Sequence, residues 1–352
     1  MRECTSIIIT VGLPVQDGRP QSYPLGECLR SVAAGLKRGD LVVVRSTLVP
    51  GYTRDFVLPI LESSGLKAGR DFYLAYSSER IAEGRAFEEF EQMPGLVSGI
   101  DGESLRRAKE LLGIVTKAPL IEASSFEAVE LAKLLENISR DVNIAMVNEM
   151  AKVSKAMGLN IFEIIELANT HKRVNLLYPG PGVGGYCIPN ALHYLAARAE
   201  SLGVPLPLLE AARNVNEEMP AYVVSLVNRH LPVPPAAARI GVLGLAMKDY
   251  SSDTRCSPAL KIVWLLERSG MRVKAFDPAV PERYPFSVDS LAEAVEGAHG
   301  LLVLARQEGI DYESWELFRN AMSRDGRPFI IDTKRVYGGR SFERDGILVD
   351  SI

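Results

Sequence analysis

The chain has 352 residues, of which 24% are charged and 47% hydrophobic, and a formal net charge of −4. This length exceeds what one ordinary core needs and predicts two or three domains, while the hydrophobic content excludes a disordered chain. Lys and Arg are scattered, which argues against nucleic acid as a partner, and no apolar run is long enough to span a membrane. We therefore expect a soluble cytoplasmic protein with neither nucleic acid nor membrane as a partner.

The first part of the chain alternates short apolar runs with helical segments. Strands are predicted at "SIIITV" (6–11), "LVVVRST" (41–47) and "FYLAYSS" (72–78). Helices are predicted between them, one over 23–40 that ends at Gly39 and one over 53–65. Such alternation is typical of a parallel sheet with crossover helices, so residues 1–120 are interpreted as a first α/β domain.

The central region is predicted to be mainly helical. Residues 124–157 contain neither Gly nor Pro before Met157 and predict one helix of about 50 Å. Ser124 or Ser125 is the expected N-cap, with Glu127 in the first turn. A helix this long and apolar is expected to pair with a second copy, so we predict a homodimer and interpret residues 121–230 as a central helical region for dimerisation and the active site.

A second α/β region follows the Pro-rich stretch "LPVPPAAA" (231–238), which has the composition of a linker. Strands are predicted at 239–248, 272–278, 300–305 and 328–336, and helices at 258–270 and 289–297. The fold class predicted from the sequence is therefore α/β, with two Rossmann-like parallel-sheet domains, 1–120 and 235–352, joined by a long central helix.

Four cysteines lie far apart without C-x-x-C spacing, which predicts neither a metal site nor a disulfide framework. Cys187 stands out because it lies within "PGPGVGGYCIPNALHYL" (179–195). Glycine allows positive φ and close approach of a ligand, so we interpret this loop as leaving room for a substrate to reach the thiol. The alternative is a tight structural turn whose cysteine is buried.

The string "GPGVGGYCIP" (180–189) closely resembles the active-site loop of the nucleotide-sugar 6-dehydrogenases, the UDP-glucose/GDP-mannose dehydrogenase family. Four further stretches resemble this family in the same order, and the resemblance runs from about residue 6 to the C-terminus. The loop and the residues before it, "HKRVNLLYPGPGVGGYC" (171–187), are closest to the UDP-N-acetylmannosamine branch. The four stretches are "VVVRSTLVPGYT" (42–53), "YSSERIAEGRAFEEF" (76–90), "ELAKLLENISRDVNIAMVNE" (130–149) and "GVLGLAMKDYSSDTRCSPAL" (241–260).

The resemblance implies an NAD-dependent four-electron oxidation of the C6 alcohol of a UDP-N-acetylhexosamine or UDP-hexose to a uronic acid, for polysaccharide or glycan precursors. Cys187 would hold the aldehyde as a thiohemiacetal and then a thioester. Lys133 and Asn137 lie four residues apart on one helix face and would stabilise the C6 oxyanion. Glu79 would assist thioester hydrolysis and Thr47 would hold the water. Without the resemblance, Lys133 and Asn137 would be interpreted as part of a solvated polar helix face, and Thr47 as a strand-end cap.

The resemblance also implies binding residues on all three domains, with residues 1–120 binding NAD and residues 235–352 binding the UDP-sugar. Lys334 and Arg335 both stand where the family carries a substrate-binding arginine, and the correspondence stays open between them. The residues implied for NAD are Gly12, Pro14, Ser46, Thr47, Glu83 and Arg255. Those implied for the sugar nucleotide are Arg80, Ile81, Ala82, Glu83, Lys133, Asn137, Arg173, Tyr178, Gly180, Gly184, Gly185, Lys248, Lys334 and Arg335.

The sequence departs from the family pattern in several places. No Gly-x-Gly-x-x-Gly turn follows the first strand, which predicts that the N-terminal part of the NAD domain is missing. Ala191 stands at the position of an aspartate four residues after the cysteine, Leu13 replaces a threonine and Cys256 a glutamate. These departures favour an alternative, a catalytically silent, truncated dimeric homologue that binds nucleotide sugar. The retained Cys187, with its lysine, asparagine and glutamate partners, keeps the enzyme as the leading hypothesis.

Overall fold

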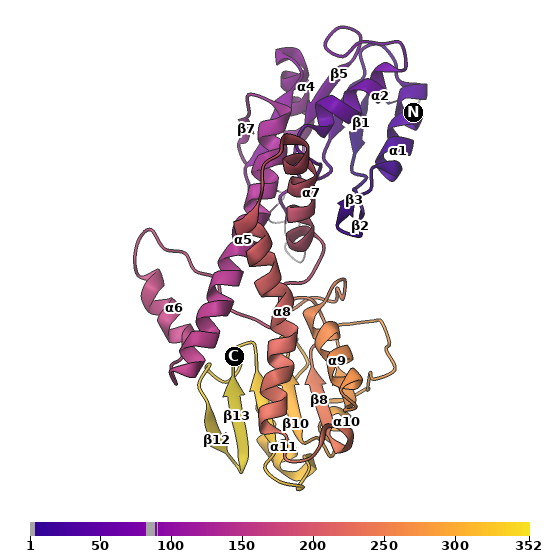
Figure 1. Cartoon of the computed structure of the whole chain (residues 1–352). Helices are drawn as coiled ribbons and strands as arrows, with labels where there is room; N and C mark the ends of the chain where they lie inside the picture. Colours follow the sequence, from indigo (N-terminus) through magenta and orange to yellow (C-terminus); the bar gives the residue numbers. More distant parts are fainter. Residues whose placement is uncertain (1–3, 82–88, 90) are drawn as a thin grey trace. The chain divides into compact units, whose positions relative to one another are not determined.

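The computed structural model describes residues 4–81, 89 and 91–352 (Figure 1). The chain forms two compact units. The first contains residues 1–138 and 190–207, and the second contains residues 139–189 and 208–352. The division between the units falls within α5 (Phe126–Ala156) and α7 (Cys187–Leu202), and after the first residue of α8 (Pro207–His230).

The first unit is built on a five-stranded sheet in the order β1-β4-β5-β6-β7. Strand β4 reads LVVV and is buried along its whole length, as expected for a strand covered on both faces. Residues of β4, β5 and β6 pack against α4 in one apolar cluster. The elements are β1 (Ser6–Ile9), β2 (Val15–Gln16), β3 (Arg19–Pro20), α1 (Tyr23–Gly35), β4 (Leu41–Val44), the π-helical turn η1 (Thr53–Val57), α2 (Leu58–Glu62), β5 (Tyr73–Tyr76), β6 (Gly95–Gly99), α4 (Gly102–Leu112) and β7 (Leu120–Glu122).

Two features of this unit differ from the sequence prediction. The sheet is mixed rather than fully parallel, because β6 runs antiparallel to β5. Helix α1 ends at Gly35 and not at Gly39, because the following residues form a turn. The buried carboxylate of Asp40 closes that turn by accepting a hydrogen bond from the Lys37 backbone N–H at 2.9 Å.

The predicted long helix is confirmed as α5, whose 31 residues span about 47 Å. The Ser125 hydroxyl accepts a hydrogen bond from the backbone N–H of Ala128 at 3.2 Å, as an N-cap does. Its burial is one-sided, because Leu131 and Leu135 are 46% and 63% exposed. Part of the apolar surface of α5 therefore faces outward at Leu131 and Leu135.

The second unit holds a six-stranded sheet in the order β12-β13-β11-β10-β8-β9, parallel except for β12. Helices α8 and α9 pack on one face and α10 and α11 on the other, which gives three layers (Figure 1). The elements are α6 (Ile161–Asn169), α8 (Pro207–His230), the 3₁₀ turn η2 (Pro235–Ala237), β8 (Arg239–Leu243), α9 (Pro258–Arg268), β9 (Arg272–Phe276), α10 (Leu291–Val295), β10 (Gly300–Val303), α11 (Trp315–Ala321), β11 (Phe329–Asp332), β12 (Phe342–Arg344) and β13 (Ile347–Ser351).

Two Rossmann-like sheets and a long central helix thus confirm the predicted fold class, with a mixed sheet in the first unit. Among the described residues, no helix combines the length and the apolar character needed to cross a bilayer.

Candidate active site

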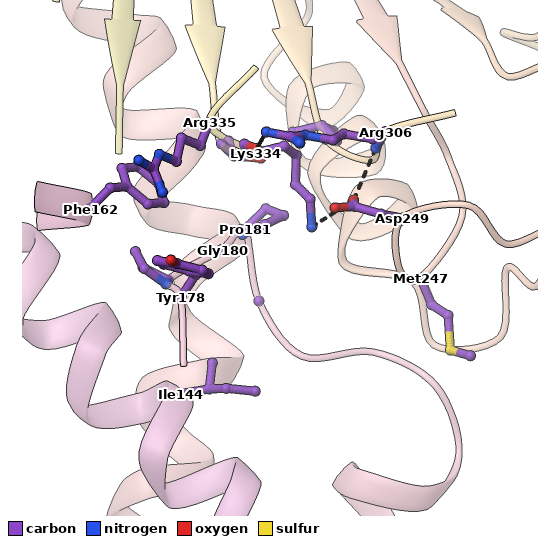
Figure 2. A pocket seen from close by; sticks show the side chains of 14 residues that line it. Ile144, Phe162, Tyr178, Gly180, Pro181, Met247, Asp249, Arg306, Lys334 and Arg335 are labelled. Atoms are coloured by element: carbon purple, nitrogen blue, oxygen red, sulfur yellow. Dashed lines mark hydrogen bonds and ion pairs between the residues drawn. The ribbon is translucent and has the colours of Figure 1, made fainter. Parts of the chain in front are cut away.

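A cavity with a volume of about 500 Å³ lies in the second unit, at the carboxyl ends of its parallel strands (Figure 2). Segments that follow β8, β10 and β11 form much of its wall, which is where open α/β sheets bind ligands. The predicted binding residues Tyr178, Gly180, Lys334 and Arg335 all line it. The complete lining is Ile144, Phe162, Tyr178, Pro179, Gly180, Pro181, Gly182, Met247, Asp249, Leu304, Arg306, Thr333, Lys334 and Arg335.

The side chains that line the cavity include three cations, Arg306, Lys334 and Arg335, and one carboxylate, Asp249. Lys334 Nζ lies 2.9 Å from Asp249 Oδ1, and the Arg306 guanidinium donates to the Lys334 carbonyl at 2.6 Å (Figure 2). In the part of the chain that the structure describes, the buried Nε of Arg306 has no hydrogen-bond partner. An anion with several oxygens, such as a diphosphate, would satisfy these donors.

An aromatic pair lies at the opposite end of the cavity. The rings of Phe162 and Tyr178 are 5.8 Å apart, and the Arg335 guanidinium lies 5.5 Å from the first ring centre and 5.7 Å from the second. Glu166 on α6 holds Arg335 by an ion pair of 2.5 Å. Figure 2 shows Arg335 reaching toward Phe162. Aromatic faces flanked by a cation suit a planar heterocycle.

The turn after β11 explains why two adjacent cations line one cavity. Asp332 is buried, and its carboxylate accepts hydrogen bonds from the backbone N–H of Lys334 at 2.9 Å and of Tyr337 at 2.8 Å. Burial raises the pKa of Asp332 above its ordinary value, although these hydrogen bonds oppose the shift. Arg335 adopts a φ of 58° in this tight turn. Both Lys334 and Arg335 therefore reach the cavity, so the structure does not select one over the other.

The glycines before Cys187 have a packing role that the sequence did not reveal. A Cβ on Gly184 would come within 2.7 Å of the Cys256 carbonyl and of Pro258 Cδ. A Cβ on Gly185, whose φ is +81°, would collide with the sulfur of Met247. These two glycines do not line the cavity but pack against the segment between β8 and α9. Close packing of two loops is thus one physical reason for the glycine string, besides the substrate access predicted from sequence.

Cys187 is the first residue of α7, and its side chain is exposed, so the reading of a buried cysteine in a structural turn is wrong. Three other predicted residues do not line the cavity. Arg173 is exposed, Lys248 is half-buried, and the exposed Arg255 forms an ion pair of 2.5 Å with Asp253. The backbone N–H of Gly185 donates to the Arg255 carbonyl at 3.0 Å.

In the first unit, Glu79 lies at the carboxyl end of β5 in a small pocket of about 40 Å³. Its carboxylate accepts hydrogen bonds from Arg45 at 2.6 Å and from the backbone N–H of Arg80 at 2.8 Å and Ile81 at 3.0 Å. Burial alone would raise the pKa of Glu79, but these hydrogen bonds outweigh it and the pKa is lowered. The predicted binding residues Ala82 and Glu83 lie outside the described residues.

Lys133 and Asn137 are buried on α5, with 8% and 1% of their surface exposed. The sequence reading of a solvated polar face is therefore wrong for this pair. One turn earlier, the fully buried Glu130 accepts hydrogen bonds from the backbone N–H of Gly51 at 2.5 Å and the Thr53 hydroxyl at 2.6 Å. Burial raises the pKa of Glu130, while these hydrogen bonds oppose the shift. Glu130 thereby fixes the turn that follows β4.

The remaining predicted cofactor residues lie at the carboxyl ends of parallel strands in the first unit. Gly12 and Pro14 follow β1, and Ser46 and the half-buried Thr47 follow β4. A Cβ on Gly12 would meet no atom within 4 Å. Near them, the buried Ser78 hydroxyl after β5 has no hydrogen-bond partner among the described residues. Open backbone and an unsatisfied hydroxyl at this edge of the sheet fit a dinucleotide.

The sequence missed several cavity residues. Asp249 and Arg306 each follow a predicted strand at its carboxyl end, which is a signal that sequence reasoning could have used. Phe162 and Glu166 carried no such signal, because α6 meets Arg335 only through the tertiary fold. The Gly-x-Gly-x-x-Gly spacing does occur at Gly180, Gly182 and Gly185, but it follows a loop after α6 and not a strand.

Three domain models of one protein family match successive parts of the chain. The family model described as the UDP-glucose/GDP-mannose dehydrogenase family, NAD binding domain, matches residues 1–114. The central domain of the same family matches residues 127–218 and its UDP binding domain residues 241–339. The match from residue 1 means that the predicted loss of the N-terminal part of the NAD domain is not supported.

Individual relatives agree with the domain matches. The chain is 37% identical to a UDP-N-acetyl-D-mannosamine dehydrogenase of Pyrococcus horikoshii over 333 residues, which are 94% of this chain and 77% of the relative. It is 32% identical to a UDP-N-acetyl-D-glucosamine 6-dehydrogenase of Pseudomonas aeruginosa over 315 residues, 87% of this chain and 74% of the relative. A solved UDP-D-ManNAc dehydrogenase of P. horikoshii superposes with a TM-score of 0.90 at 34% identity, over 100% of this chain and 81% of that chain.

Fold, cavity and domain matches together define an NAD-dependent oxidoreductase of nucleotide sugars. The chain belongs to the UDP-glucose/GDP-mannose dehydrogenase family.

Proposed function

We propose that this dehydrogenase oxidises the C6 alcohol of a UDP-N-acetylhexosamine, or of a UDP-hexose, to the uronic acid through a covalent intermediate on Cys187. The observation that carries the proposal is the cavity of the second unit. Its aromatic end, Phe162 and Tyr178, suits a uracil ring, and its cations Arg306 and Lys334 suit a diphosphate. The relatives named for N-acetylated sugars make a UDP-N-acetylhexosamine the first substrate to test.

Cys187 supplies the nucleophile for the second oxidation. After the alcohol has become an aldehyde, the thiol proton leaves, the sulfur adds to the carbonyl carbon and the carbonyl π electron pair moves onto the oxygen, which gives the oxyanion of a tetrahedral thiohemiacetal. Loss of hydride gives a thioester, and attack by water breaks the carbon–sulfur bond and restores the thiol. NAD, when bound, takes up the two hydrides. One alcohol, two NAD⁺ and one water thus yield one carboxylate, two NADH and three protons.

The other proposed roles fall on residues of the first unit. Lys133 and Asn137 would donate to the developing C6 oxyanion. The carboxylate of Glu79, which already accepts three hydrogen bonds, would orient the hydrolytic water rather than act as a strong base. Thr47 would hold that water. Gly12, Pro14, Ser46 and the Ser78 hydroxyl would contact the dinucleotide.

A homodimer through α5 is part of the proposal. Met146, Met150, Val153 and Met157 follow helical spacing on one face and are between 46% and 66% exposed. A second copy of the chain would bury this stripe. Light scattering should therefore give twice the chain mass, and Met150→Lys should shift it toward the monomer. A monomeric wild type, or a Met150→Lys variant that keeps the wild-type dimer mass, would contradict this assembly.

The experiment for the reaction mixes the protein with NAD⁺ and, in turn, UDP-N-acetylmannosamine, UDP-N-acetylglucosamine and UDP-glucose, and follows NADH by absorbance. We expect NADH and an acidic sugar product with at least one of the N-acetylated sugars, and no complete turnover by Cys187→Ser. Binding of UDP without any NADH formation would favour the silent nucleotide-sugar binder instead.

A further inference from the structure

The segment that carries Tyr178 and Gly180 into the cavity has no regular secondary structure of its own. Three asparagine side chains hold its backbone instead. Asn143 on α5 donates to the Asn175 carbonyl at 2.8 Å and accepts from the Leu177 N–H at 2.9 Å. Asn169, at the end of α6, accepts from the Leu176 N–H at 2.7 Å and donates to the Leu176 carbonyl at 3.0 Å.

Asn148 is the third of these side chains and lies fully buried on α5. Its Oδ1 accepts from the Gly180 N–H at 3.0 Å, and its Nδ2 donates to Asn216 Oδ1 on α8 at 2.9 Å. The Asn216 amide in turn donates to Asp141 Oδ1 at 2.7 Å. Arg213 Nη1 lies 3.1 Å from the same carboxylate oxygen.

This buried chain of hydrogen bonds can run in only one direction. The backbone N–H of Gly180 can only donate, so Asn148 must present its oxygen there and its amide nitrogen to Asn216. Asn216 must then present its oxygen to Asn148 and its nitrogen to the Asp141 carboxylate, which can only accept while ionised. Asp141 and Asn216 are 4% and 1% exposed, so solvent does not replace a lost partner.

The loop that forms this cavity wall also contacts α8 directly, at a second position. Gly182 packs on α8, where a Cβ would come within 3.3 Å of both the Asn216 carbonyl and Pro220 Cδ. Pro220 lacks an N–H and leaves the Asn216 carbonyl without its helical partner. The loop therefore rests on α5 and α8 at Gly180 and again at Gly182.

We propose that Asn143, Asn148, Asn169 and Asn216 form an asparagine clamp of positioning residues, which holds the Tyr178–Gly182 wall so that it binds the nucleotide of the substrate. The inference rests on the proposed function, because it takes this cavity as the nucleotide site. None of the four side chains lines the cavity, so the clamp acts through the backbone that it holds.

Replacement of a clamp asparagine by aspartate keeps the shape and removes the donor. In Asn148→Asp, one carboxylate oxygen still accepts from the Gly180 N–H. The other oxygen faces Asn216 Oδ1, so two acceptors meet and the hydrogen bond to Asn216 is lost. Asn143→Asp keeps the acceptor for Leu177 and loses the donor to the Asn175 carbonyl. This second variant lies at a partly exposed position and is expected to fold. Asn175→Asp, at an exposed side chain of the same loop, makes the same change outside the clamp and is the matched control.

The test measures UDP binding by calorimetry and steady-state kinetics on the full-length variants. We expect Asn148→Asp and Asn143→Asp to weaken UDP binding about tenfold and to raise KM for the sugar nucleotide, with KM for NAD unchanged and Asn175→Asp equal to wild type. Loss of structure alone would lower the active fraction and kcat but not change KM.

Clamp variants that bind UDP as tightly as wild type would overturn the inference while leaving the proposed function intact. A wild type that does not bind UDP would overturn the proposed function itself. If Asn148→Asp does not fold, Asn143→Asp alone decides between these outcomes.

Discussion

Substitution of Gly185 by alanine tests whether loop packing accounts for the glycines before Cys187. The φ of +81° is a left-handed conformation that costs a residue with a Cβ about 1–2 kcal/mol. The new Cβ would also meet the sulfur of Met247, and such overpacking costs about 1–3 kcal/mol. We therefore expect Gly185→Ala to lower the free energy of unfolding of the second unit by about 3 kcal/mol.

Met247→Ala supplies the second variant of a double-mutant cycle. The Met247 side chain is half-buried and flexible, and its removal relieves the collision but not the backbone strain. The coupling between the two substitutions should therefore be favourable by about 1–2 kcal/mol. In contrast, Met247→Ala should not rescue Gly184→Ala, because the Gly184 Cβ would meet the Cys256 carbonyl and the Pro258 ring at 2.7 Å.

Urea unfolding followed by tryptophan fluorescence is a suitable assay, because both tryptophans of the chain, Trp264 and Trp315, belong to the second unit. Full stability of Gly185→Ala together with lost turnover would refute the packing argument. That result would mean that Gly185 serves only substrate access.

Three further predictions follow from the hydrogen bonds and ion pairs. Thr53→Val removes one donor to the buried Glu130 carboxyl and should cost about 2 kcal/mol of unfolding free energy. Burial raises the pKa of Glu130, so Glu130 destabilises the fold as pH rises above its unfolded-state pKa, and the Thr53 hydroxyl opposes this by stabilising the ionised carboxylate. The cost of Thr53→Val should therefore grow as pH rises, and an equal cost at acidic and alkaline pH would contradict it. Burial alone would raise the pKa of Asp350, but hydrogen bonds from Lys155, Ser341 and His230 lower it. Asp350→Asn should therefore cost about 2 kcal/mol at neutral pH and progressively less as pH falls below about 4, as measured by urea titrations. Lys334→Met should weaken UDP binding about tenfold in calorimetry, with a smaller effect at high salt, and unchanged affinity would remove Lys334 from the phosphate site.

The sequence predicted the centres of the strands better than their surroundings. Leu41–Val44 was predictable, because a continuous apolar β-branched run is buried in almost any parallel sheet. The end of α1 was not predictable, because the helical pattern of the sequence continues to Gly39. The Asp40 side chain accepts a hydrogen bond from the Lys37 N–H and so stabilises a turn there instead of helix. Strand β6, "GLVSG", is too short and glycine-flanked for its pattern to be recognised.

The candidate site divides in the same way. Motifs pointed to Lys334, Arg335 and the loop around Cys187, because those strings are local. Phe162 and the clamp residue Asn216 act through partners far away in the sequence, and no local pattern reports such contacts. The reason for Gly184 and Gly185 was likewise hidden until the segment between β8 and α9 was seen against them.

The central claim, oxidation of one carbon twice on Cys187, is tested most directly by counting NADH against acid. The protein is given a limiting amount of the UDP-sugar that it turns over, with excess NAD⁺, and both products are quantified. The account predicts two NADH for each uronate and no free aldehyde, and predicts that Cys187→Ser forms no uronate. A ratio of one with accumulated aldehyde, or uronate formed by Cys187→Ser, would contradict it.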